Sequence, residues 1–132
     1  MTAGLEGKGS VLSTSSEEDY LRTIYELDIE RGAVRSVDVA KILNVSKPSV
    51  NKALSRLEEE GMVTRLPYSP VVLTEKGREK GEQLHQRYGA IRRFLIEQLE
   101  VPEERANEEA HGLEHALSAD TVQRLCAFMD GK

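Results

Sequence analysis

The segment 46–60 is the feature that most restricts what this chain can fold into. Ser46 is a good helix N-cap, and Pro48 stands in the first turn, where its missing N–H costs nothing. Helical spacing predicts a buried stripe of Val50, Leu54 and Leu57. The other face has small hydroxyls, an amide and cations, namely Ser46, Lys47, Ser49, Asn51, Lys52 and Arg56. We therefore expect an amphipathic helix with a polar, basic outer face.

Two further helices are expected before this segment. Ser16 is predicted to cap a helix that ends at Gly32, with three acids in its first turn. Ser36 is predicted to cap a shorter helix that runs through Leu43. The residues expected to face inward in this second helix are Val37, Ala40 and Ile42 or Leu43.

A hairpin is expected after the helix. Segments 62–66 and 71–74 are rich in β-branched and aliphatic residues, and they flank a Pro-Tyr-Ser-Pro turn at 67–70. Three helices followed by a hairpin predict a mainly α fold that begins with a winged helix-turn-helix and a two-stranded wing.

Charge distribution favours DNA as the partner of this region, although the chain has a net charge of −5. Residues 35–87 hold ten Lys/Arg against seven Asp/Glu. A polar helix face alone is common, but here the turn, caps, wing and local charge occur in the order of a DNA-binding unit. Double-stranded DNA contacts are predicted for Ser36, Ser46, Lys47, Pro48, Ser49, Asn51, Lys52 and Arg56.

The C-terminal part predicts three more helices. A long helix should begin at Thr74 and reach Leu99, a second should span 103–117, and Ser118 should cap the last. Their apolar faces exceed what they can bury among themselves, so we expect a homodimer. The residues predicted at the dimer interface are Ile91, Phe94, Leu95, Leu113 and Leu117. The predicted organisation is a flexible arm at 1–15, a DNA-binding domain at 16–76, and metal-binding and dimerisation helices at 77–132.

The motif His-Gly-Leu-Glu-His at 111–115 suggests the chemistry of these helices. His111, Glu114 and His115 fall within one sector of a helix, where they could chelate a divalent metal. A solvated polar face is the plainer interpretation. The spacing also matches the H-x-x-E-H motif of zinc hydrolases, but only 17 residues follow His115, and no third ligand stands well downstream.

Several classes of protein are not favoured by the composition. No apolar run approaches the roughly 20 residues of a membrane helix, and residues 1–16 lack the pattern of a signal peptide, so a cytoplasmic protein is expected. The single Cys126 sits in an apolar pattern and is given no catalytic role. We predict no enzyme activity, no membrane partner and no small-molecule substrate.

Four segments resemble the diphtheria-toxin-repressor family, in particular its short manganese-transport-regulator branch. They are Glu-Asp-Tyr-Leu-Arg-Thr-Ile-Tyr-Glu-Leu at 18–27, Val-Ser-Lys-Pro-Ser-Val at 45–50, Leu-Thr-Glu-Lys-Gly at 73–77 and Glu-His-Ala-Leu-Ser at 114–118. The resemblance implies a dimeric repressor that binds palindromic operator DNA when loaded with a divalent metal, and that controls metal uptake.

The resemblance also implies a ligand set. The family's primary metal site falls on Asp19, His111, Glu114 and His115, and the carboxylate at position 19 is similar to the manganese branch. His111 is a departure, because relatives have Glu or Cys there. Mn(II) is expected, whereas Fe(II), Co(II) and Zn(II) also suit such a set.

Further departures concern a second metal position. Arg22, Tyr88, Arg92 and Asn107 stand where the family's branches place additional ligands, and His85 matches no ligand position. About one metal per subunit is therefore expected. The main rival interpretation is a winged-helix regulator without metal control.

Overall fold

The computed structural model describes residues 16–131 of the 132-residue chain. The predicted arm at 1–15 lies outside the described residues. The chain divides between Glu82 and Gln83 into two compact units, called here the first and the second unit. The division falls inside the helix that spans Glu75–Arg93. The predicted boundary between domains after residue 76 stays a prediction.

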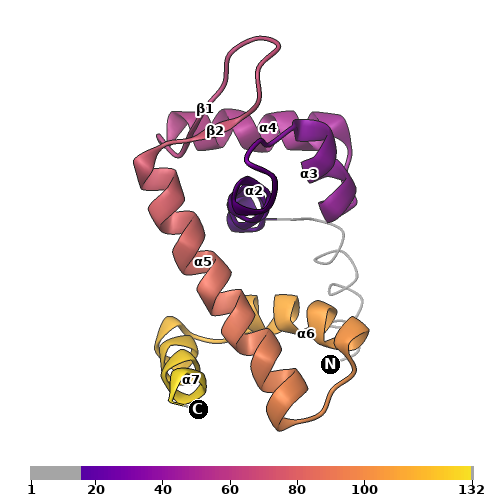
Figure 1. Cartoon of the computed structure of the whole chain (residues 1–132), viewed down its shortest axis with the longest axis vertical. Coiled ribbons are helices and arrows are strands. Elements are labelled where there is room, and N and C mark those ends of the chain that lie inside the picture. The colour runs from indigo at the N-terminus through magenta and orange to yellow at the C-terminus, as the bar shows by residue number, and fades with distance from the viewer. Residues whose placement is uncertain (1–15, 132) are drawn as a thin grey trace. The chain divides into compact units, whose positions relative to one another are not determined.

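Three helices form the body of the first unit: α2 (Glu17–Arg31), α3 (Ser36–Leu43) and α4 (Lys47–Glu59). They pack against one another, as Figure 1 shows. Apolar side chains from all three are buried between them, including Leu21, Ile24, Leu27, Val39, Val50, Leu54 and Leu57. The predicted order of helices and the predicted stripe of α4 are both confirmed.

Side-chain caps fix where two of these helices start. The Ser16 hydroxyl accepts a hydrogen bond from the Asp19 N–H, and the Ser46 hydroxyl accepts one from the Ser49 N–H. The predicted caps of α2 and α4 are thus confirmed. The predicted cap of α3 is wrong, because Ser36 is already helical and Arg35 occupies the N-cap position without a side-chain bond.

The inward face predicted for α3 is also partly wrong. Val37 and Ile42 are 41% and 54% exposed, whereas Val39 is fully buried. An eight-residue helix has only about two turns, and this one has apolar residues on both sides. Its packing against α2 and α4 selects the stripe that contains Val39.

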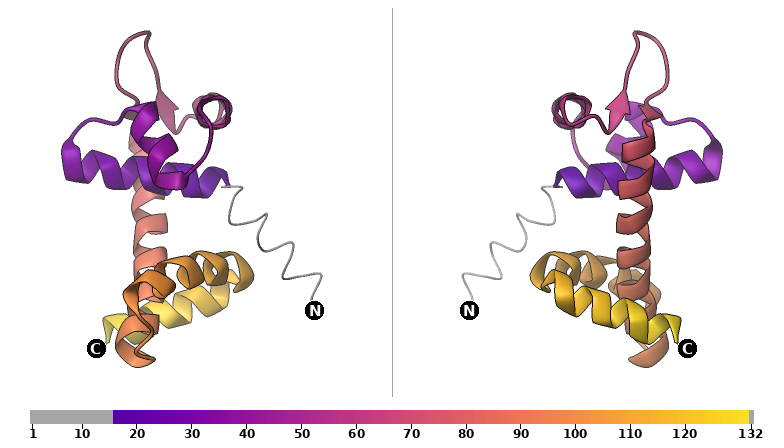
Figure 2. Two further views of the ribbon diagram at one scale, coloured as in Figure 1. Left: turned by 90° about the vertical axis from the view of Figure 1, so that its right-hand side faces the viewer. Right: turned by 90° about the vertical axis from the view of Figure 1, so that its left-hand side faces the viewer.

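The wing is a short antiparallel hairpin of β1 (Val63–Thr64) and β2 (Val72–Leu73). Val63 pairs with Leu73, and both side chains are buried. The loop between the strands extends beyond the helices of the first unit (Figure 2) and exposes Leu66 and Tyr68. The predicted hairpin is confirmed, with shorter strands than expected.

The wing joins α5 (Glu75–Arg93) through a close contact between backbones. The Thr74 hydroxyl donates to the carbonyl of Gly61 at 2.6 Å and accepts from the Gly77 N–H at 3.0 Å. At Gly77 a Cβ would lie 1.9 Å from the carbonyl oxygen of Met62. Only glycine therefore permits this approach of α5 to the chain before β1.

The second unit is built from the rest of α5, a π-helical turn η1 (Phe94–Gln98), α6 (Glu103–Ala116) and α7 (Ala119–Asp130). Helices α6 and α7 lie across the C-terminal part of α5 (Figure 2). Their common core consists of Ile91, Leu95, Ala106, Ala110 and Val122. The long helix was expected to reach Leu99, but regular α-helix ends at Arg93 and widens into the π-turn. Ser118 caps α7 as predicted.

Within residues 16–131, none of the helices combines the length and the apolar character needed to cross a membrane.

Replacing Gly77 with Ala should lower the free energy of unfolding by about 1–3 kcal/mol, because the added methyl group forces the α5 and Met62 backbones apart. Urea denaturation measures this loss. Gly89→Ala is the matched control, since a Cβ there meets nothing within 4 Å. It should be neutral or stabilising by up to about 1 kcal/mol. Equal effects at both positions would contradict the proposed role of Gly77.

Candidate metal centre and DNA-binding surface

Two histidines on α6 form the centre of the candidate metal site. His111 and His115 are one helical turn apart, with ring centroids 5.0 Å apart and rings in an edge-to-face arrangement. Each offers a ring nitrogen, and these two nitrogens lie within 4.8 Å of one another. His111 is half-buried and His115 is exposed. The pair fits a divalent transition metal, because neutral imidazoles at this spacing can bind one ion together.

Glu114 lies between these histidines in sequence but is more deeply buried than either of them. Its side chain is only 5% exposed, on the buried side of α6 with Ala110. Among residues 16–131, no oxygen of Glu114 joins the two histidine nitrogens in a set close enough to share an ion. The motif therefore supplies two converging ligands and one buried carboxylate.

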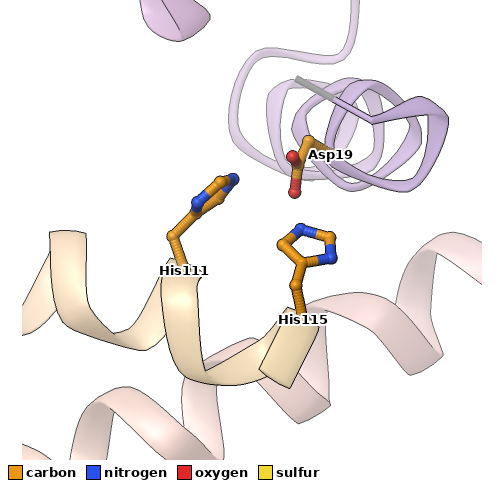
Figure 3. A group of neighbouring side chains, drawn as sticks. All are labelled: Asp19, His111 and His115. Atoms are coloured by element: carbon orange, nitrogen blue, oxygen red, sulfur yellow. The ribbon is translucent and has the colours of Figure 1, made fainter. Parts of the chain in front are cut away.

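Asp19, the other predicted ligand, lies in the first turn of α2 in the first unit. Figure 3 draws its side chain with those of His111 and His115. Its Oδ2 accepts a hydrogen bond from the Ser16 N–H at 3.1 Å, which completes a capping box. The carboxylate of Asp19 is buried. The pKa of the neighbouring Tyr20 is raised mainly by the burial of that phenol and further by the negative charge of Asp19. Asp19 is thus a fixed, buried acid at the start of a helix.

Polar contacts hold α6 on α5 in the second unit. The Arg92 guanidinium pairs with Glu103 at 2.7 Å and donates to the Asn107 side chain. The Tyr88 hydroxyl donates to the Asn107 carbonyl at 3.1 Å. Tyr88, Arg92 and Asn107 are predicted, from the resemblance alone, to stand at additional ligand positions. In the structure they form, with Glu103, a hydrogen-bonded brace that reaches α6 one to two turns before His111.

The predicted DNA-contacting residues lie on the surface of the first unit. All of those on and just before α4 are exposed, namely Ser46, Lys47, Pro48, Ser49, Asn51, Lys52 and Arg56, whereas Ser36 of α3 is half-buried. Ser46 and Ser49 are hydrogen-bonded to each other, hydroxyl to hydroxyl, at 3.0 Å. The two lysines therefore supply the exposed positive charge at the N-terminal end of α4.

Arg56 is in a different position from the lysines. Its guanidinium lies 3.3 Å from the Glu17 carboxylate, in the first turn of α2. Sequence reasoning missed this pair, because the two residues are 39 positions apart and share no local pattern. Arg56 remains a predicted DNA contact, but its charge already has a partner, Glu17, within the protein.

Both parts of the chain match descriptions of one protein family. Residues 13–71 match "Iron dependent repressor, N-terminal DNA binding domain" and residues 74–131 match "Iron dependent repressor, metal binding and dimerisation domain". The chain belongs to the iron-dependent repressor family. The resemblance to diphtheria-toxin-repressor-like regulators is confirmed.

Individual relatives agree with this family. An HTH-type transcriptional regulator of Methanocaldococcus jannaschii is 37% identical over 89% of this chain and 94% of its own length. The transcriptional regulator MntR of Salmonella typhimurium is 37% identical over 84% of this chain and 70% of its own length. The solved manganese regulator SloR is 32% identical, with a TM-score of 0.76, and covers 89% of this chain. This chain spans 54% of that structure's chain.

The remaining candidate residues lie in the second unit of this iron-dependent repressor family member. Ile91 and Leu95, predicted at the dimer interface, are buried in the unit's own core, and Phe94, Leu113 and Leu117 pack partly against it. Burial raises the pKa of the Cys126 thiol, and Asp130 raises it further against an opposing effect of Arg87. A thiol of this kind is a poor nucleophile at neutral pH.

Replacing Lys47 or Lys52 with Ala should weaken DNA binding and reduce the slope of log K against log salt by about 0.9 for each lost phosphate contact. Asn51→Ala, if the amide reaches a base, should reduce sequence discrimination by about 1–3 kcal/mol. Fluorescence anisotropy with a duplex that this protein selects from a random library measures both. Arg124→Gln, on the exposed face of α7, is the control. Normal binding by all three α4 variants would mean that α4 is not the recognition helix.

Proposed function

We propose that this chain is a metal-dependent transcriptional repressor that binds palindromic operator DNA as a homodimer when it holds a divalent transition metal. The observation that supports this most is the presence of a pair of histidines, His111 and His115, at metal-chelating distance within the part of the chain that matches the family's metal-binding domain. The exposed basic face of α4 lies within the matching DNA-binding domain.

The proposed ligands are Asp19, His111, Glu114 and His115. The two imidazoles provide nitrogen, and the two acids provide anionic oxygen, so the set suits an ion of borderline hardness. Glu114 is the least accessible member, because its carboxylate is buried on α6. Asp19 is the member that belongs to the DNA-binding domain.

Mn(II) is the proposed physiological ion. Affinity order alone would favour Zn(II) over Mn(II) at such a set, so the choice depends on metal availability and geometry. The support comes from relatives, since those described as MntR and the manganese regulator SloR resemble this chain over most of its length. Control of metal uptake is the function we propose on the same basis.

The proposed homodimer uses the second unit. Ile91 and Leu95 already fill the core of this unit, so they cannot also be the main contact with a second copy. Apolar side chains that remain exposed on the second unit must therefore contribute to the dimer interface. Phe128 is 49% exposed and stacks edge-to-face on Phe94, with ring centroids 6.3 Å apart. These rings extend the predicted interface residues to the surface.

Titration with Mn(II) should saturate near one ion per chain, because the described residues contain one group of converging ligands. The free ion is followed by electron paramagnetic resonance. His115→Ala should weaken binding at least about tenfold, since a two-nitrogen chelate loses one donor, and should abolish metal-dependent DNA binding while leaving the dimer intact.

The third histidine provides the control for this experiment. His85 lies on α5 and matches no ligand position, so His85→Ala should bind Mn(II) like the wild type. Two tight ions per chain would refute the stoichiometry. A wild-type protein whose DNA affinity is unchanged by Mn(II), Fe(II), Co(II) and Zn(II) would favour the rival function, a winged-helix regulator without metal control.

Metal and operator should each raise the affinity of the other by the same factor, typically about 5–150-fold, because binding linkage is reciprocal. If Asp19 and the α6 histidines hold one ion, that ion joins the two domains. Asp19→Asn, which keeps an oxygen for the helix cap, should then reduce this coupling factor more than it reduces metal affinity alone. Mn(II) affinity measured with and without the selected duplex gives the factor.

Glu18→Gln is the matched control for charge, since Glu18 is the neighbouring acid in the first turn of α2 and pairs with Lys80. Its coupling factor should equal that of the wild type. An unchanged factor in Asp19→Asn would mean that Asp19 does not join the domains through the metal.

A further inference from the structure

Arg22 is a buried cation in the middle of α2. The residue is only 7% exposed, whereas arginines usually keep the guanidinium in water. Removing a charge from water is costly unless partners compensate it. The surroundings of Arg22 must therefore supply negative charge.

Two carboxylates of the same helix supply that charge. One terminal nitrogen of the guanidinium lies 3.6 Å from Asp19 Oδ1, and the other lies 3.7 Å from Glu26 Oε2. Asp19 precedes Arg22 by about one turn, and Glu26 follows it by about one turn. The three groups form one stripe along α2, with two negative charges and one positive charge.

The carboxylate of Asp19 is divided between two contacts. Its Oδ2 accepts the hydrogen bond of the capping box, whereas its Oδ1 faces Arg22. The cap fixes the carboxylate, so a metal ion that binds Asp19 must do so beside the guanidinium. The side chain of Arg22 thus adjoins the proposed metal ligand without belonging to the ligand set.

We propose that Arg22 is an internal counter-cation that sets the metal affinity of the site at Asp19. In the metal-free protein it balances the buried carboxylate, and on metal binding its positive charge opposes the incoming dication. This inference rests on the proposed function. Because a guanidinium stays protonated and buried charges are weakly screened, the opposition persists at neutral pH and ordinary salt.

The distances from the Arg22 guanidinium to its two carboxylates are longer than those of a strong ion pair. Strong charge-assisted hydrogen bonds are about 2.7–2.9 Å long, and the pair of Arg78 with Asp28 in the same unit has this length, 2.7 Å. Arg22 instead lies about equally far from both carboxylates, at 3.6 and 3.7 Å. Its charge thus serves both Asp19 and Glu26, and movement of the guanidinium toward Glu26 would reduce its opposition to a metal ion at Asp19.

Arg22→Gln tests the proposal, because glutamine keeps polarity and removes the charge. Mn(II) affinity of the full chain is measured by electron paramagnetic resonance of the free ion, and thermal unfolding is recorded with and without Mn(II). The dissociation constant should fall about fivefold or more. The metal-free variant should melt at a lower temperature than the wild type, because its carboxylates lose their counter-charge, and Mn(II) should raise its Tm by more.

Two variants separate charge from general disturbance. Arg22→Lys keeps the positive charge, so its Mn(II) affinity should stay close to that of the wild type. Arg78→Gln removes an ion pair of α2 that does not involve Asp19, so it should leave Mn(II) affinity unchanged. An Arg22→Gln protein with unchanged or weaker Mn(II) affinity would overturn the proposal.

If Arg22→Gln does not fold without metal, Glu26→Gln tests the same proposal. Glu26 is partly exposed, with 33% of its side chain accessible, so the change is better tolerated. Losing this partner should draw the guanidinium toward Asp19 and weaken Mn(II) binding several-fold, and unchanged or tighter binding would overturn the proposal. A wild-type chain that binds no Mn(II) would instead refute the proposed function, so the two failures are distinguishable.

Discussion

The close approach of α5 to the Met62 carbonyl is the contact on which the rest of the structure depends. Gly77 permits it, and the Thr74 hydroxyl secures it by bonding to both sides of the junction. A helix turns by about 100° per residue, so its starting point decides which residues face each way along its whole length. Because α5 contributes to both units, this one junction determines that Gly81 meets Tyr25 in the first and that Ile91 enters the core of the second.

The first turn of α2 combines several electrostatic roles in few residues. Asp19 closes a capping box, faces a buried arginine, and is the acid that we propose as a metal ligand. Two positions earlier, Glu17 pairs with Arg56 of α4. The same helical turn therefore contacts the start of its own helix, a buried cation and the helix proposed to recognise DNA. A change in charge at this turn would therefore act directly on Arg56 of α4, through its ion pair with Glu17.

Local signals in the sequence predicted the helix starts well and the buried faces less well. Ser16, Ser46 and Ser118 cap as expected because a hydroxyl followed by a periodic segment is a short-range pattern. Ser36 does not, since a serine is also acceptable inside the first turn. The burial of Val39 in place of Val37 follows from the packing of α3 against α2 and α4, which periodicity does not encode. The π-turn after Arg93 also has no counterpart in the apolar spacing of the sequence.

The candidate site shows the same limit. The spacing of the α6 histidines identified a pair that does converge, but it also placed Glu114 on a polar face where the structure has it buried. The departure at Arg22 was visible in the sequence. Its burial and its two carboxylate partners were not, because they depend on how side chains orient around α2.

The wing has a practical consequence for optical work on this protein. The chain contains four tyrosines and no tryptophan, so its intrinsic fluorescence comes from phenol rings alone. Tyr68 stands fully exposed at the tip of the wing, whereas Tyr20 is buried. A dissolved quencher such as iodide or acrylamide should therefore reach Tyr68 far more readily than Tyr20. A molecule that covers the wing would reduce the quenching of Tyr68 fluorescence. Contact at this loop can therefore be measured on the unlabelled chain.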